Sequence, residues 1–181
     1  ALLSRATRVA VRSNNIRRLL QTFQALADLG PEMTADRDFQ QRARSMLALL
    51  MEAVAAQEAA LFTFTDKPAM LSSVAAHGFA LFAEPAVIPL LPKHVHALTS
   101  ARLPQAVNAK SSETFFSSNG NVAPELFRCV APLKVGSRLV GAVTLGRREG
   151  DAIYAEEEFE ALHLLAQYVA LAVHNHTLWQ S

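Results

Sequence analysis

The stretch Leu126 to Arg148, LFRCVAPLKVGSRLVGAVTLGRR, decides the fold of this chain. Its first arm, Phe127 to Val135, places apolar residues at every second position, which is the period of a strand. Gly136 and Ser137 then suit a two-residue type II′ turn, because glycine supplies the positive φ that the first central position needs. The second arm, Arg138 to Leu145, is apolar on both faces. We therefore expect helices on one face of the sheet and loops or a pocket on the other.

A helix is predicted over residues 155–181. Three glutamates open it, where negative charge complements the helix dipole. One apolar stripe runs along it, at Phe159, Leu162, Ala166, Val169 and Val173. On another side, Leu164, Leu171 and Leu178 recur every seven residues. We expect the first stripe to pack on the sheet and the second to meet the same helix of a second copy. Burial within one monomer, beneath the N-terminal helix, is the alternative.

Periodicity and turn residues assign the rest of the chain. The sequence predicts a helix at Asp36–Ala55, strands at Glu58–Thr65 and Met70–Ala76, and a short helix at Pro92–Ala101. Two prolines break the apolar run Phe79 to Leu91, so we expect it to meander over the sheet rather than pair within it. The polar segment from Arg102 to Pro124 is predicted to be a long loop, either a lid or a disordered segment.

Residues 132–145 and the helix after them resemble the GAF domain, a family of small regulatory sensor modules. The resemblance rests on a Pro-Leu pair ending one strand, a short turn, the run LVGAVTL and a helix rich in Leu and Ala. It covers roughly Asp36 to Leu178. It implies an α+β fold with a central antiparallel sheet, N- and C-terminal helices packed on one face for dimerisation, and a ligand cavity closed by helices and loops on the other.

The chain divides into two parts on charge. Residues 1–30 hold five arginines against one aspartate, a net +4, which leaves −3 for the remainder of a chain whose total is +1. We predict an N-terminal signalling or linker helix at 1–30 and a sensor domain at 31–178, whose last helix continues toward an effector domain. We interpret the arginines as a solvated helix face, because no aromatic residues interleave with them as in a nucleic-acid contact. A basic helix beside a membrane is the alternative.

Val9, Ile16 and Phe23 of this N-terminal helix are also spaced by seven residues, and we predict that they join the dimer interface. An ordinary amphipathic helix packed on its own domain fits the same pattern. The chain begins at Ala1, so we expect it to be cut from a longer protein. No apolar run approaches the ~20 residues that cross a bilayer, and with one cysteine the composition favours a cytoplasmic domain.

Two adjacent phenylalanines interrupt the polar segment 102–124. Side chains of this kind must cover something apolar, either the domain's own sheet or a ligand. The resemblance implies that this connection roofs the cavity. We predict a ligand pocket for a small organic or anionic molecule, lined by Phe62, Phe64, Phe82, Val95, Phe115, Phe116 and Arg128.

The sequence offers no catalytic or metal-binding group. Cys129 is the only thiol, which excludes an intramolecular disulfide and a cysteine-based zinc site. His94 and His96 are two apart, as are His174 and His176, so neither pair shares a helix face. Free methionine sulfoxide reductases of the resembled family use several cysteines, the cyclic-nucleotide-binding members carry an Asn-Lys-Phe-Asp-Glu signature, and the bilin-binding members attach chromophore through Cys next to His. None of these patterns is present in this sequence. The cofactor is unknown.

The resulting hypothesis is a non-catalytic regulatory sensor domain. It binds an unknown small molecule, forms a homodimer through its terminal helices and passes a signal to a covalently attached effector. A purely structural dimerisation module without a ligand and a membrane-proximal relay domain are the alternatives.

Overall fold

The computed structural model describes residues 21, 36–79, 84–148, 150 and 153–180. The predicted helix at 1–30 lies outside the described residues except for Gln21. Val9, Ile16, Phe23 and Phe82 lie outside them as well.

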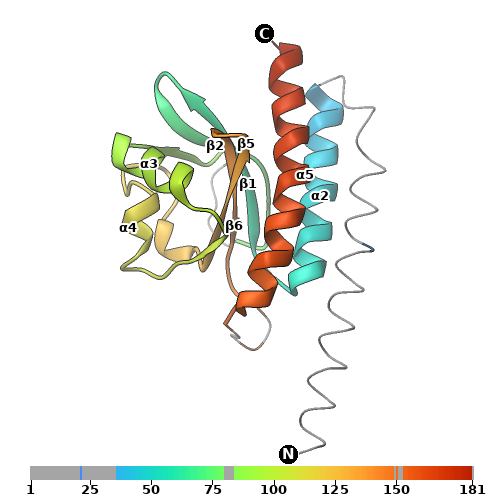
Figure 1. Cartoon of the computed structure of the whole chain (residues 1–181), viewed down its shortest axis with the longest axis vertical. Coiled ribbons are helices and arrows are strands. Elements are labelled where there is room, and N and C mark those ends of the chain that lie inside the picture. The colour runs from blue at the N-terminus through green and yellow to red at the C-terminus, as the bar shows by residue number, and fades with distance from the viewer. Residues whose placement is uncertain (1–20, 22–35, 80–83, 149, 151–152, 181) are drawn as a thin grey trace, which may run out of the picture.

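Six antiparallel strands form the sheet in the order β3-β2-β1-β6-β5-β4 within the described residues (Figure 1). They are β1 Ala59–Asp66, β2 Ala69–His77, β3 Val87–Pro89, β4 Gln105–Ala106, β5 Cys129–Val135 and β6 Arg138–Leu145. The hairpin β5–β6 has the predicted turn. Val135 pairs with Arg138, Gly136 has a φ of 63° and Ser137 does not have a positive φ, which fits type II′ rather than type I′.

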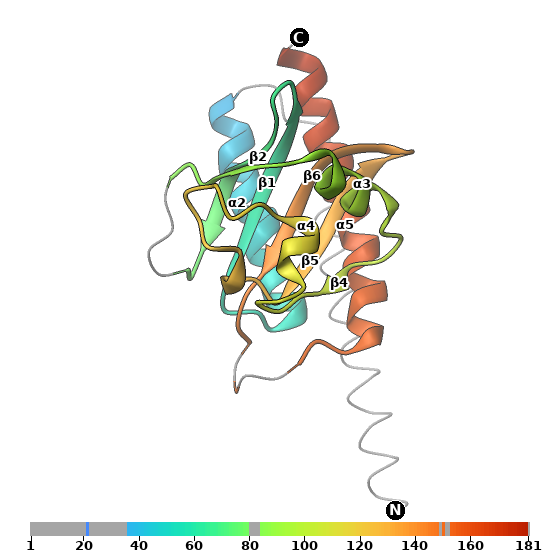
Figure 2. The same ribbon diagram turned by 90° about the vertical axis from the view of Figure 1, so that its left-hand side faces the viewer.

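Strand β6 lies near the centre of the sheet, between β1 and β5, and every residue from Leu139 to Leu145 is buried. Both of its faces are therefore covered, as its two-sided apolar pattern predicts. Helices α2 Asp36–Val54 and α5 Glu156–Gln180 lie side by side on one face (Figure 1). Helices α3 Pro92–Ser100 and α4 Ser112–Phe115 lie on the other face, which is turned toward the viewer in Figure 2. The 3₁₀ turn η2 Pro124–Leu126 precedes β5.

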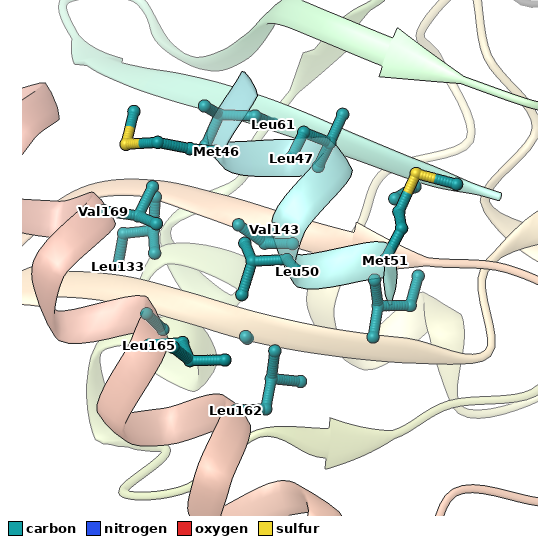
Figure 3. Packing of buried hydrophobic residues seen from close by; sticks show 14 of the residues in the cluster. Met46, Leu47, Leu50, Met51, Leu61, Leu133, Val143, Leu162, Leu165 and Val169 are labelled. Carbon is teal, nitrogen blue, oxygen red and sulfur yellow. The ribbon is translucent and has the colours of Figure 1, made fainter. Parts of the chain in front are cut away.

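The core between the sheet and the two long helices is apolar throughout. Figure 3 shows how α2, α5 and the strands each contribute to it; the labelled residues are Met46, Leu47, Leu50 and Met51 of α2, Leu162, Leu165 and Val169 of α5, and Leu61, Leu133 and Val143 of the sheet. We call this group, with its neighbours, the helix-side core. The two helices also meet directly, because the Phe39 ring stacks on the His176 ring at a centroid distance of 3.8 Å. No described helix is both long and apolar enough to span a membrane.

Two expectations from the sequence are wrong. The run Phe79–Leu91 does pair within the sheet, because Val87–Pro89 forms β3 against Met70–Ser72 of β2. This strand is short and lies at the edge of the sheet, where a proline that cannot donate a hydrogen bond is tolerated.

The polar segment 102–124 is not structureless either, because it contains β4 and α4. The Asn108 side chain orders its middle: Oδ1 accepts hydrogen bonds from the backbone N–H groups of Lys110 and Ser111, just before α4. Such side-chain turns supply the backbone partners that a long loop would otherwise lack.

The connection from β6 to α5 is held by Arg148. Its guanidinium makes two contacts with the Glu158 carboxylate, at 2.8 and 2.7 Å, and donates to the backbone oxygen of Ile153. It also lies over the Tyr154 ring, 4.8 Å from the centroid. The Tyr154 hydroxyl in turn donates to the backbone oxygen of Gly146 at 3.0 Å. These bonds tie the end of β6 to the first turn of α5.

We expect Glu158→Gln to lower the free energy of unfolding by about 1–3 kcal/mol, because it leaves the Arg148 guanidinium, 14% exposed, without its ionic partner. Urea denaturation measures the change. Glu160→Gln, an exposed glutamate on the same helix, should stay within about 0.5 kcal/mol of the unaltered chain. Equal losses from both substitutions would show that the ion pair does not hold the connection.

Candidate functional site

A second hydrophobic core lies on the face of the sheet that α3 and α4 cover. Its buried members come from the strands, from α3 and from the segments around α4: Ala60, Phe62, Leu71, Ala86, Ile88, Leu90, Leu98, Val107, Phe116, Val122, Phe127, Val130, Leu139 and Ala142. We call it the loop-side core. The sheet separates it from the helix-side core, so the domain has two independent apolar interiors.

Aromatic rings gather around Phe127 in the loop-side core. The rings of Phe62, Phe79 and Phe116 lie 6.2, 5.7 and 5.2 Å from the Phe127 ring, each at a steep interplanar angle. Edge-to-face pairs of this kind are favourable. Phe62 comes from β1, Phe79 from the segment after β2, Phe116 from the segment after α4, and Phe127 from the connection between η2 and β5. One aromatic cluster therefore joins segments that are far apart in the sequence.

The structure places five of the predicted pocket residues together on this face. Phe62 and Phe116 are buried in the loop-side core, and three partly buried side chains pack against it, Phe64, Val95 and Phe115. Arg128 is exposed, and its guanidinium donates to the backbone oxygens of Glu125 at 2.7 Å and Phe127 at 3.3 Å. That arrangement holds the turn before β5. Contact between Arg128 and a ligand stays a prediction.

His94 joins α3 to α4, which carries Phe115. Its ring is 3% exposed; Nδ1 accepts a hydrogen bond from the backbone N–H of Leu91 at 3.0 Å, and Nε2 lies 3.1 Å from the backbone oxygen of Glu113. Only the neutral ring with a proton on Nε2 satisfies both partners. Burial is the main cause that lowers the pKa of His94; the bond to Glu113 raises it and the charge of Lys93 lowers it further. From the sequence we considered His94 only as a possible metal ligand. Its role as a bridge between α3 and α4 was not predicted.

Thr144 places a hydroxyl in the loop-side core. It lies between Ala60 of β1 and Val130 of β5, both members of that core, and it is completely buried. Within the described part of the chain its Oγ1 has no hydrogen-bond partner. A buried hydroxyl without a partner costs about 1–3 kcal/mol, so such groups are uncommon in native cores. The threonine in the otherwise apolar run LVGAVTL indicated a polar group within a buried strand. The sequence could not show that its hydroxyl lacks a partner.

Cys129 faces the other side of the sheet. It is fully buried in the helix-side core, and burial, followed by the charge of Glu158, raises the pKa of its thiol. A thiol in such surroundings is a poor nucleophile. Among the described residues, no group of three or more His, Cys, Asp or Glu side chains could hold a metal ion.

The three leucines predicted to form a dimer seam are exposed on α5. Leu164, Leu171 and Leu178 are 54%, 49% and 57% exposed, which is unusual for large apolar side chains on a helix otherwise packed on a core. Tyr168 and Asn175 lie between them, so the five positions follow one another at spacings of four and three residues. That 4-3 repeat is the spacing of a two-stranded coiled coil. The heptad spacing of the leucines alone did not predict the two intervening positions.

We expect the free energy of unfolding to fall as the pH drops below about 6.5, the ordinary pKa of histidine. In this range the unfolded chain protonates His94, whereas the folded chain, with a lowered pKa, keeps it neutral and so binds fewer protons. Urea denaturation between about pH 7 and pH 5 should give a shallower slope for His94→Gln than for the unaltered chain. His96→Gln, at an exposed position on the same helix, should keep the slope; an unchanged slope in His94→Gln would contradict the assignment.

No family model and no curated protein matches the sequence. Solved structures do match. The GAF domain of a putative sensor histidine kinase from Pseudomonas syringae pv. tomato is 18% identical with a TM-score of 0.58, and the match covers 97% of this chain and 95% of that one. The GAF domain of an Acinetobacter phosphoenolpyruvate-protein phosphotransferase is 11% identical with a TM-score of 0.66, covering 90% and 94%.

Free methionine-R-sulfoxide reductase from Neisseria meningitidis, solved with its substrate, is 16% identical with a TM-score of 0.63, covering 91% of this chain and 90% of that one. Identities this low establish the fold and leave the activity open. The α+β prediction of a central antiparallel sheet with terminal helices on one face is thus confirmed, and the chain has the fold of GAF domains.

Proposed function

We propose that this chain is a non-catalytic sensor domain, which binds a small molecule in the loop-side core and passes the signal to an attached effector through α5. Solved structures with this fold include parts of a sensor histidine kinase and of a methyl-accepting chemotaxis protein, which supports a regulatory role. The only thiol faces the helix-side core with a raised pKa, which argues against thiol chemistry in the loop-side core.

The unpartnered hydroxyl of Thr144 is the observation that carries the ligand proposal. Its neighbours in the loop-side core are apolar or aromatic, so a ligand that fits there is mostly apolar and carries one group that hydrogen-bonds to Oγ1. The predicted residues Phe62, Phe64, Val95, Phe115 and Phe116 would surround its apolar part.

Entry of the ligand requires the layer above the aromatic cluster to move. His94 holds α4 to α3, and the Asn121 side chain holds the following segment to the edge of the sheet by accepting from the backbone N–H of Val87 and donating to the backbone oxygen of Pro85. These bonds are few, so an open and a closed arrangement can exchange. A ligand that binds the two with different affinity shifts their populations.

A short route connects the ligand position to α5. Thr144 lies two residues before Gly146, whose backbone oxygen accepts the hydrogen bond of the Tyr154 hydroxyl. The Arg148 guanidinium lies over the Tyr154 ring and forms an ion pair with Glu158 in the first turn of α5. A shift of the end of β6 would therefore move the start of the helix that leads to the effector.

The dimer proposal rests on the leucines of α5. Leu164, Leu171 and Leu178 would occupy d positions of a parallel two-stranded coiled coil, with Tyr168 and Asn175 at a positions. Leucine at d favours two strands, and a polar asparagine at a fixes the register of the two chains. In such a dimer the two copies of α5 leave the domain side by side, so their relative rotation or tilt is the signal that an effector could detect.

Thr144→Val should raise the free energy of unfolding by about 1 kcal/mol, because it removes the unpaired hydroxyl at constant volume. It should also remove any small molecule that native mass spectrometry finds on the gently purified protein. Thr63→Val is the matched control on the neighbouring strand, since its hydroxyl is already bonded to the backbone oxygen of Ser72. It should not stabilise the protein.

A bound mass that survives in Thr144→Val would refute the assignment of the hydroxyl. If the unaltered chain carries no extra mass and no screened compound raises its melting temperature, the alternative of a structural module with a filled core holds instead.

Leu171→Glu should convert the dimer into monomers, because it places a charge in the centre of the seam; we expect the dimer dissociation constant to rise by at least about tenfold. Sedimentation equilibrium measures it. Leu103→Glu makes the same change at another exposed leucine, in the segment after α3, and should leave association unchanged. A monomeric unaltered chain at all concentrations would contradict the proposal.

A further inference from the structure

We propose that the groove between α2 and the end of β2 is a second ligand site, which takes a small anionic amphiphile: one acidic group joined to a short apolar body. The groove has a volume of about 290 Å³, just below the roughly 300–1,000 Å³ of small-molecule pockets. It is lined by Leu47, Ala48 and Met51 of α2 together with Ala76 and His77 of β2 and the side chain of Arg44. It shares none of its lining residues with the aromatic cluster around Phe127.

A small side chain on α2 and a bulge in β2 border this space. Ala48 lines it from the helix with a single methyl group, whereas Ala76, which lines it from the strand, also packs against the loop-side core. Strand β2 also carries an irregularity, because Leu61 pairs with Ala75 while Phe62 pairs with Ser73. A bulge bends the bulged strand and increases its twist. In the described residues β3 pairs only with Met70–Ser72, so the bent end of β2 lies at the edge of the sheet next to α2.

Arg44 gives the lining of the groove a positive charge. Arg44 and His77 are both exposed, and within the described ranges neither side chain makes a hydrogen bond or an ion pair. Glu52 lies on the same face of α2, one turn beyond Ala48, and does not line the groove. Glu58 is buried and bonded to Arg147. An arginine that lacks an acidic partner, placed beside an apolar floor, suits a carboxylate or a similar anion.

Charge also argues against the other occupants. Residues 1–30 carry a net +4, so the like charge of Arg44 disfavours this segment as the occupant. The exposed leucines that would pair two copies of the chain lie on α5 and contribute nothing to the groove. A small molecule with an apolar body and one anionic group would contact the apolar lining residues and pair with Arg44.

Occupancy of the groove would act on α2. Leu47 and Met51 line it and also belong to the helix-side core, to which α5 contributes Leu162, Leu165 and Val169 (Figure 3). Phe39 at the other end of α2 stacks on His176 of α5. The groove would thus supply a second input to the same pair of helices, from the opposite side of the sheet to Thr144.

The test compares octanoate with octan-1-ol, which has the same chain length without the charge, on the full 181-residue chain followed by ¹⁵N NMR titration. We expect octanoate to bind about tenfold more tightly, the usual effect of one charge-assisted hydrogen bond. The amide signals of Arg44–Met51, Ala76 and His77 should shift most. Arg44→Met should bring octanoate to the affinity of octan-1-ol, and Ala48→Phe should weaken both compounds by filling the groove. Arg138→Met, at the exposed tip of the β5–β6 hairpin, is the matched control and should change nothing.

Equal affinities for the two compounds, no binding of either at millimolar concentration, or shifts centred on Thr144 and Phe127 would overturn the proposal. So would groove signals that change with protein concentration alone, since a second copy would then be the occupant. Thr144→Val should retain octanoate binding in the groove, so failure of the loop-side site and failure of this one are told apart.

Discussion

The burial of β6 on both faces is the constraint on which the rest of the structure depends. Each residue from Leu139 to Leu145 is buried, and a strand in this position needs an apolar layer above and below the sheet. Two long helices provide one layer, and α3, α4 and their connections provide the other. The domain consequently has two cores of different construction. One is closed by long helices with continuous apolar stripes, and the other by short segments held through a few side-chain bonds.

That difference in construction suits the two tasks that we propose for the domain. Long helices packed through Leu, Met and Val shift as rigid units rather than deform, as a signal-transmitting element must. The short segments of the loop-side layer are held by His94, Asn108 and Asn121, whose hydrogen bonds are few. Regions of this kind open more readily than a packed core. Thr144 fits the same logic, because a polar group that weakens a core is most readily explained by a task other than stability.

The elements with strong local signals could be predicted from the sequence. The β5–β6 hairpin follows from its alternation and from Gly136, and α2 and α5 follow from their apolar periodicity. Strand β3 and helix α4 could not, because they depend on partners distant in the sequence: Val87 bonds to Asn121, and Glu113 bonds to His94. The aromatic members of the candidate pocket were predictable as residues that must cover something. The unsatisfied state of Thr144 was not, since hydrogen bonding is decided by the assembled neighbours.

Alternation along β6 has an evolutionary consequence. Val143 and Leu145 belong to the helix-side core, whereas Ala142 and Thr144 face the loop-side core, so consecutive codons specify parts of the protein with different tasks. If the loop-side core holds the ligand as we propose, substitutions at 142 and 144 alter what the domain recognises while the helix packing at 143 and 145 is preserved. A descendant protein can then acquire a new stimulus and keep its old output. This separability accords with a fold that is retained in proteins only 11–18% identical to this chain.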